Sequence, residues 1–269
     1  MSTPSFRFRQ FTVWHDRCAM KVGTDGVLLG AWVHVPACSL VHVLDIGTGS
    51  GLIALMLAQR AALAQVDALD IDAEAVSQAS DNFRNSPFAD RLSAYHSSVQ
   101  DWQMVNDKCP NGKCPNGKCP SDKCSNGTCP NGKCYDLIVS NPPFFRESLR
   151  NPDAARNAAR HTDTLSYADL LSHSVRLLGP EGRLALVLPA DSLTDILALA
   201  DRAGLGLLRL TRVYSKPGKP VRRVLMELTR IHNIPQGLDA LGNADTLFIE
   251  GESSPRSEQY AALTRDFYL

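Results

Sequence analysis

The 269-residue sequence has no excess of either charge and no long apolar run. Its 28 Lys and Arg residues balance its 28 Asp and Glu residues, so the net charge gives no sign of a strongly charged partner. No segment reaches the roughly 18 consecutive apolar residues that a membrane-spanning helix needs. The first residues are polar and lack the apolar core of a secretion signal. We therefore expect a cytoplasmic protein that is not bound to a membrane.

The balance of apolar and charged residues suits a globular protein. Hydrophobic residues make up 44% of the chain and charged residues 21%, as in one large domain with its own core. We expect a single domain over residues 1–269 with two additions. A hairpin and helix extend it at residues 1–35, and a flexible Cys-rich insertion occupies residues 107–134.

Cysteine is concentrated in that insertion. Six of the eight cysteines recur every five residues in variants of the unit Lys-Cys-Pro-Asn-Gly. A period of five matches neither helix nor strand, and Pro and Gly oppose both. A reducing cytosol disfavours a disulfide scaffold. Cys-x4-Cys lies at the edge of zinc-ligand spacing, but the run lacks the paired layout of a zinc module. We interpret it as an inert surface loop and assign no metal site, with metal binding as the alternative.

The apolar pattern predicts alternating strands and helices over most of the chain. An edge strand at 6–13 pairs with 18–22, and Thr24-Asp25 caps a helix over 26–32. The further strands are expected at 41–46, 66–71, 92–96, 135–140, 183–188, 204–214, 221–230 and 246–250, and the helices at 52–60, 73–85, 166–178 and 191–203. Alternation followed by a strand-rich end predicts an α/β fold with a parallel sheet and an antiparallel edge.

A glycine-rich turn, Gly47-Thr-Gly-Ser-Gly51, joins the strand at 41–46 to the next helix. Glycines allow a tight turn and a close approach of the backbone to a ligand, and the helix N-terminus offers free N–H groups to an anion. Asp45 is placed to hold an ammonium group or to order the loop. Asp70 ends the next strand, where a carboxylate can accept both hydroxyls of a ribose. Asp72 is the alternative for that role, unless it caps the following helix.

Asn141-Pro142-Pro143-Phe144 directly follows the strand at 135–140. The side-chain oxygen of Asn141 and the carbonyl of Pro142 can hold the two hydrogens of an exocyclic amine, which frees its lone pair to attack a methyl group. Proline adds rigidity, and Phe144 offers a face on which a flat base stacks. Transfer then depends on positioning, and the base must be unstacked to reach the pocket. A rigid turn after a strand is the simpler interpretation of the four residues alone. Together with the glycine-rich turn, they indicate an S-adenosylmethionine-dependent N-methyltransferase.

The strand at 92–96 is followed by Ser97-Ser-Val-Gln-Asp-Trp102, where a polar side chain is expected to touch the adenine of the methyl donor. We assign this contact to Ser98, with Asp101 as the alternative. A simple role in the turn competes with both assignments.

These motifs resemble the class I methyltransferases that carry Asn-Pro-Pro-Phe or Asn-Pro-Pro-Tyr and act on adenine N6, guanine N2 or glutamine N5. The segment 10–32, QFTVWHDRCAMKVGTDGVLLGAW, further resembles the bacterial valine-tRNA adenine N6-methyltransferase family, and the similarity extends from about Phe6 to Arg230. Many members of that family have Asp where this chain has Ser98, and the cysteine repeat is not part of the family pattern.

The resemblance implies a Rossmann-like class I methyltransferase fold with a seven-stranded, mostly parallel sheet, an antiparallel edge and helices on both faces. It implies S-adenosylmethionine as cofactor and adenine 37 of a valine tRNA, beside the anticodon, as acceptor. The catalytic residues are then Asn141, Pro142, Pro143 and Phe144. The cofactor-binding residues are Thr24, Asp45, Gly47, Thr48, Gly49, Gly51, Asp70, Ile71, Ser98 and Asn141.

Binding of tRNA requires contacts to phosphates, which basic side chains supply. The predicted tRNA footprint consists of Arg146, Arg150, Arg156, Arg160, Lys216, Lys219, Arg222 and Arg223. Each of them taken singly is equally well an ordinary surface charge. We expect no obligate protein partner.

Other functions remain open at this stage. A guanine of ribosomal RNA or a glutamine amide of a protein is an alternative acceptor, although Asn-Pro-Pro-Tyr is more usual for the glutamine enzymes than the Phe144 form. A non-catalytic, thiol-rich metal binder on an inactive methyltransferase scaffold is an alternative of another class.

Deleting residues 108–133 tests the interpretation of the cysteine repeat. We expect the variant to fold and to keep its methyl transfer, because the segment is placed away from the strand ends that form the pocket and because doubling a loop costs only ~0.6 kcal/mol. Thermal melting and transfer of a labelled methyl group measure the two properties. A folded variant without activity contradicts the interpretation.

Overall fold

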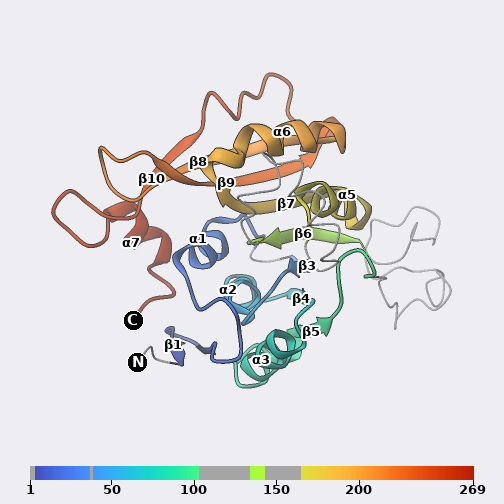
Figure 1. Ribbon diagram of the computed structural model, residues 1–269, viewed down its shortest axis with the longest axis vertical. Coiled ribbons are helices and arrows are strands. Elements are labelled where there is room, and N and C mark those ends of the chain that lie inside the picture. Colours follow the sequence, from blue (N-terminus) through green and yellow to red (C-terminus); the bar gives the residue numbers. More distant parts are fainter. Residues whose placement is uncertain (1–3, 37–38, 103–133, 143–164) are drawn as a thin grey trace, which may run out of the picture.

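An eight-stranded sheet forms the centre of the computed structural model, which describes residues 4–36, 39–102, 134–142 and 165–269 (Figure 1). The strands lie in the spatial order β10 (Asp245–Phe248), β8 (Leu205–Tyr214), β9 (Val221–Arg230), β7 (Leu178–Pro189), β6 (Tyr135–Ser140), β3 (Val41–Ile46), β4 (Ala64–Asp70) and β5 (Leu92–His96). A separate small sheet pairs β1 (Ser5–Arg7) with β2 (Thr12–Trp14).

The large sheet is mostly parallel, as predicted. All neighbouring pairs from β5 to β7 are parallel, and β10 is parallel to β8. Only β9 runs antiparallel to its neighbours, and it lies between β7 and β8 rather than at the edge. The predicted count of seven strands is one too low, because β10 adds a further strand to β8.

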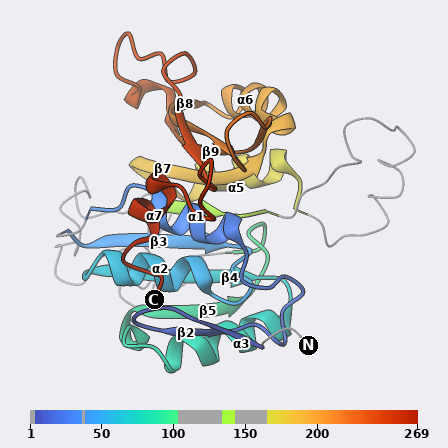
Figure 2. The same cartoon turned by 90° about the vertical axis from the view of Figure 1, so that its left-hand side faces the viewer.

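Helices cover both faces of the sheet. One apolar cluster includes side chains from α1 (Thr24–Trp32), α2 (Leu52–Arg60), α3 (Ala73–Arg84) and α7 (Glu258–Thr264). The other includes α5 (Tyr167–Leu177) and α6 (Leu193–Arg202). Figure 2 shows α3 beside β5 at one end of the sheet, with β2 against α3, and β8 with α6 at the other end. Among the described residues, no helix combines the length and the apolarity needed to cross a membrane.

The strand β3 shows why the central strands could be predicted well. It is buried on both faces, so its apolar residues form a nearly continuous run. The predicted bounds of β3, α2, β5, β6 and β9 agree with the structure residue for residue. The helix α7 was not predicted.

The N-terminal hairpin differs from the prediction. It closes between β1 and β2, with Phe6 opposite Val13, and no residue from 15 to 23 is in a strand. The cause is a tight turn in which the Phe8 amide donates to the Phe11 carbonyl at 2.8 Å and the two buried rings stack with centroids 4.8 Å apart. The helix α1 begins at Thr24, after Gly23, without a side-chain cap, so the predicted cap is also wrong.

Candidate active site at the carboxyl edge of the sheet

The loop of residues 47–51, here called the donor loop, joins β3 to α2 in a conformation that requires glycine. Gly47, Gly49 and Gly51 have φ angles of 72°, 55° and 80°, a region that other residues rarely adopt. Apart from the two chain neighbours, no atom of the described residues lies within 4 Å of the position that a Cβ would take at Gly47 or Gly49. At Gly51, a Cβ would lie 2.4 Å from the Phe83 ring. The first two glycines therefore leave open space for a ligand, whereas Gly51 allows close packing against α3.

Hydrogen bonds from β4 hold the donor loop in place. The amides of Gly47 and Thr48 donate to the Leu69 carbonyl, each at 2.9 Å, and the Gly49 amide donates to Asp70 Oδ2 at 2.8 Å. Asp70 Oδ1 accepts from the Asp72 amide at 3.0 Å. Because each carboxylate oxygen accepts more than one bond, Asp70 retains capacity for ribose hydroxyls, and that role stays a prediction.

Asp72 serves as the N-cap of α3. Its side chain accepts a hydrogen bond from the Glu74 amide at 3.0 Å. The capping interpretation of this residue is therefore confirmed, and Asp70 is the better placed of the two carboxylates to face a ligand of the donor loop.

Asp45 is a buried carboxylate with an unused acceptor. Its Oδ2 accepts from the Thr48 hydroxyl at 2.7 Å, whereas Oδ1 has no hydrogen-bond partner among the described residues. Burial raises the pKa of Asp45 to about 7, against the opposing effects of hydrogen bonding by the Thr48 hydroxyl and the Ala54 backbone. A buried acceptor of this kind is costly unless a donor reaches it, and an ammonium group of a ligand would supply one.

The remaining predicted cofactor residues follow β4 and β5 or begin α1, and the predicted contact to the adenine of the donor is the one after β5. Ser98 donates to Asp101 Oδ2 at 2.7 Å and accepts from the Asp101 amide at 3.1 Å, so the two alternatives form one hydrogen-bonded unit. Ile71 is 52% exposed, which leaves an apolar surface beside Asp70. Thr24 is exposed at the start of α1. The cofactor roles of Ser98, Ile71 and Thr24 stay predictions.

The predicted amine-binding residues Asn141 and Pro142, here called the clamp, follow β6, which pairs with β3, the strand before the donor loop. The buried Ser140 hydroxyl donates to the Ile46 carbonyl at 2.8 Å and so joins the end of β6 to the end of β3. The next residue is Asn141, whose Oδ1 is buried and has no partner within the described part of the chain. Pro142 is buried. The predicted residues Pro143 and Phe144 lie outside the described residues.

Part of the predicted tRNA footprint lies at this edge of the sheet. Arg223 pairs with Pro189 at the carboxyl end of β7, so the turn between β8 and β9 projects from the same edge. Lys216, Lys219 and Arg222 are exposed there. Arg223 is less exposed, and its Nε donates to Asp25 Oδ2 at 2.8 Å. The other four predicted residues, Arg146, Arg150, Arg156 and Arg160, lie outside the described residues.

Sequence reasoning missed two buried amides on α3, Gln78 and Asn82, which contact the N-terminal segment and the donor loop. The available signal was their spacing of four residues on the buried face of a helix, where apolar side chains are the rule.

Comparison with known proteins places these features in a family. A family profile described as a methyltransferase domain matches residues 43–110, which include the donor loop and Asp70. A predicted O-methyltransferase of Agrobacterium tumefaciens shares the fold, with a TM-score of 0.59 at 17% identity over 90% of this chain and 96% of that one.

Curated relatives match over the full chain. The tRNA1(Val) (adenine(37)-N6)-methyltransferase of Parabacteroides distasonis is 44% identical over 100% of this chain and 99% of its own length. The protein of the same name from Bacteroides fragilis is 43% identical, and that from Trichodesmium erythraeum is 41% identical, with the same coverage. The chain therefore belongs to the tRNA1(Val) (adenine(37)-N6)-methyltransferase family.

Proposed function

We propose that this protein transfers a methyl group from S-adenosylmethionine to the N6 amine of adenine 37 in a valine tRNA, the reaction named for its relatives. The observation that carries the proposal is the Oδ1 of Asn141, which is buried, has no partner among the described residues and follows a strand joined directly to the strand before the donor loop. The Asn141 oxygen is thus available as a hydrogen-bond acceptor beside the proposed site of the methyl donor.

The donor end of the site consists of groups that fit S-adenosylmethionine. Asp45 Oδ1 would accept from the ammonium group, and Asp70 from the ribose hydroxyls. The backbone at Gly47 and Gly49 leaves room for the ligand, and the N-terminus of α2 favours its carboxylate. Ile71 and Ser98 would border the adenine. When bound, the cofactor supplies an electrophilic methyl group on its sulfonium.

The acceptor end holds the amine that is to be methylated. Asn141 Oδ1 and the Pro142 carbonyl would accept the two amine hydrogens, which favours a pyramidal nitrogen with its lone pair turned to the methyl group. Both acceptors are fixed before the substrate arrives, so they stabilise the positive charge that develops on nitrogen without reorganisation. Phe144 would stack on the base, which must leave its stack to enter the site.

Several further properties belong to this proposal. We take the chain as one methyltransferase domain over residues 1–269, with the additions at 1–35 and 107–134. We assign the enzyme to the cytoplasm, where tRNA is modified, and infer no obligate protein partner. The exposed cations of the β8–β9 turn, together with Arg146, Arg150, Arg156 and Arg160, form the proposed tRNA footprint.

The reaction is tested by incubating the protein with labelled S-adenosylmethionine and with total RNA and protein from a strain that lacks the gene. We expect label in tRNA as N6-methyladenosine, and Asn141→Ala to lose at least about 100-fold in turnover, as when one positioned polar group is removed from an active site. The variant should keep its affinity for the donor. The exposed Asn85→Ala is the matched control and should keep wild-type turnover. Label only in ribosomal RNA or protein contradicts the acceptor, and unchanged turnover of Asn141→Ala contradicts the clamp.

Asp45 should make donor binding depend on pH. Its pKa is about 7 in the folded protein against an ordinary 3.8. Between these two pH values the folded protein keeps the proton that the unfolded chain loses. The contribution of this carboxyl to the free energy of unfolding therefore falls as the pH rises from 3.8 to about 7. An ammonium group needs the ionised form, so we expect the dissociation constant of S-adenosylmethionine to rise as the pH falls through 7, by up to about tenfold per unit. Calorimetric titration between about pH 6 and 8 measures this.

The matched variants separate Asp45 from other carboxylates. Asp45→Asn should bind the donor more weakly and remove most of the pH dependence. Asp201→Asn, at an exposed position on α6, should retain it. A pH-independent affinity in the wild type contradicts the assignment of Asp45 to the ammonium group.

The cations of the β8–β9 turn should act on tRNA and not on the donor. We expect the triple variant Lys216→Ala, Lys219→Ala and Arg222→Ala to bind tRNA about tenfold more weakly or worse and with a flatter salt dependence, because lost phosphate contacts release fewer counterions. Filter binding at several salt concentrations measures both effects. Arg222→Ala alone is compared with Arg202→Ala, an exposed arginine at the opposite edge of the sheet. An unchanged salt slope in the triple variant contradicts this footprint.

A further inference from the structure

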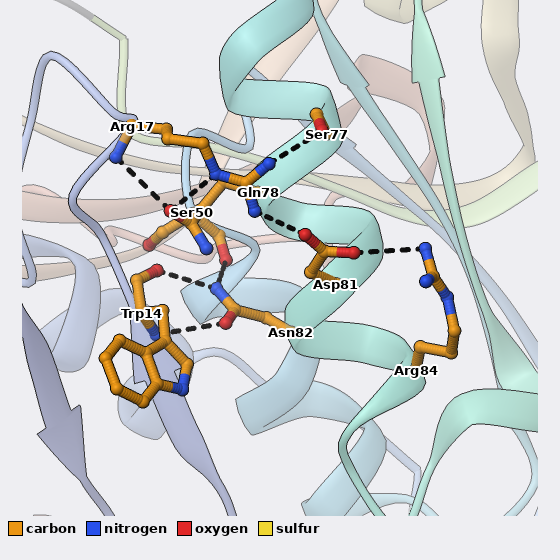
Figure 3. A network of polar contacts seen from close by, with 8 residues as sticks. All are labelled: Trp14, Arg17, Ser50, Ser77, Gln78, Asp81, Asn82 and Arg84. Carbon is orange, nitrogen blue, oxygen red and sulfur yellow. Dashed lines mark hydrogen bonds and ion pairs between the residues drawn. The ribbon is translucent and has the colours of Figure 1, made fainter.

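The buried face of α3 carries two amide side chains among its apolar residues. Gln78 and Asn82 are 2% and 1% exposed, and they are one helical turn apart. Figure 3 shows both between the N-terminal segment and the rest of the domain. Burying an amide costs free energy unless its hydrogen bonds are made. The hydrogen-bond partners of these two side chains therefore indicate their structural role.

Asn82 bonds only to backbone, and it reaches two segments that are distant in sequence. Its Oδ1 accepts from the Trp14 amide at 3.0 Å, and its Nδ2 donates to the Trp14 carbonyl at 2.8 Å. The same Nδ2 donates to the Ser50 carbonyl at 2.8 Å. One side chain thus holds the end of β2 at two points and the donor loop, at Ser50, at a third.

Together with its neighbours, Asn82 completes a series of contacts along the donor loop. Gly49 is bound by Asp70, Ser50 is bound by Asn82, and Gly51 packs against the Phe83 ring. The three consecutive residues 49–51 are therefore each held by a different group. Gly49 and Gly51, on either side of Ser50, are the two whose backbone is in the left-handed region.

The segment after β2, residues 15–23, is here called the strap. Its start lies along α3, because the Arg17 amide and Nε donate to Gln78 Oε1 at 3.2 and 3.3 Å, and Nη1 donates to the Ser77 hydroxyl at 2.8 Å. Arg17 Nη2 also pairs with Asp81. Figure 3 shows these contacts and those of Asn82 as two neighbouring groups of bonds on the same helix.

The strap then runs toward the groups assigned to the donor. The pKa of Cys18 is raised to about 11 by burial and by the nearby charges of Asp70 and Asp72. The strap ends at α1, where Gly26 packs against Leu52 at the start of α2 and Asp25 binds Arg223 at the carboxyl edge of the sheet. The strap therefore leads from α3, past the charges of Asp70 and Asp72, to α1 beside the start of α2.

We propose that Asn82 is a positioning residue that couples the end of β2, where the strap begins, to the donor loop, so that both are held in the geometry that receives the methyl donor. The donor's identity rests on the proposed function. Asn82 is buried behind the donor loop, and both hydrogens of its amide and its oxygen bond within the chain, so we do not place it in contact with a ligand. Its effect on the reaction is therefore exerted through Ser50 and Trp14.

Hydrogen exchange on the ligand-free protein tests the coupling by itself. We expect Asn82→Ala to speed exchange of the backbone amides of residues 14–17 and of the donor loop together. Arg17→Ala should speed it chiefly in the strap. Arg84→Ala is the matched control, because Arg84 pairs with the same Asp81 at 3.1 Å but makes no contact to the strap, and it should leave both segments unchanged.

Donor binding and kinetics test the consequence. We expect Asn82→Ala to raise the dissociation constant of S-adenosylhomocysteine about tenfold, since two or three buried hydrogen bonds are lost, and to raise KM for the donor with kcat within about twofold. Arg17→Ala should raise the dissociation constant two- to threefold, and should add little in the Asn82→Ala background, because both changes release the same segment. Arg84→Ala should bind like the wild type.

The results separate this proposal from the proposed function. Wild-type exchange at residues 14–17 in Asn82→Ala, or equal donor affinity in the wild type, Asn82→Ala and Arg17→Ala, overturns the coupling. If Asn82→Ala does not fold, Arg17→Ala and its control decide the question. Failure of the wild type to bind S-adenosylhomocysteine counts against the proposed function, and the exchange experiment still decides the coupling.

Discussion

The hydrogen bond from the Gly49 amide to the Asp70 carboxylate, 2.8 Å long, is the contact on which the rest of the site depends. It joins the ends of two parallel strands and holds a loop whose glycines are in the left-handed region. Without such a tie, a loop of this composition would sample many conformations, because glycine has the largest backbone freedom of any residue. The loop also determines where α2 begins and how Asp45, buried behind it, is oriented toward Thr48.

Two buried acceptors then give the site its chemistry. Asp45 Oδ1 and Asn141 Oδ1 both lack a partner among the described residues, one behind the donor loop and one after β6. Stability alone disfavours such groups, because an unpaired buried acceptor costs free energy. They are explained if the cofactor and the amine of the substrate supply the missing donors. On the proposed function, the fold gives up some stability at these two positions, and binding of the ligands would restore it.

Much of this could be predicted from the sequence because the relevant signals are local. The run of apolar residues in β3, the glycines of the donor loop and the prolines after β6 each act over a few residues. The N-terminal hairpin was placed wrongly because its closure depends on Phe8 and Phe11 packing into the core, which the alternation of residues does not reveal. The role of Asn82 was missed for a similar reason, since its partners are 68 and 32 residues away.

The sequence by itself determined the order of strands and helices, the conformation of the donor loop and the kind of chemistry, since these follow from residue type and short spacing. Only the tertiary structure decided that β9 lies inside the sheet, that Asp72 caps a helix while Asp70 holds the loop, and that the strap is attached to the donor loop through one buried amide. These features depend on contacts between distant segments, and such contacts exist only once the sheet has brought its strand ends to one edge.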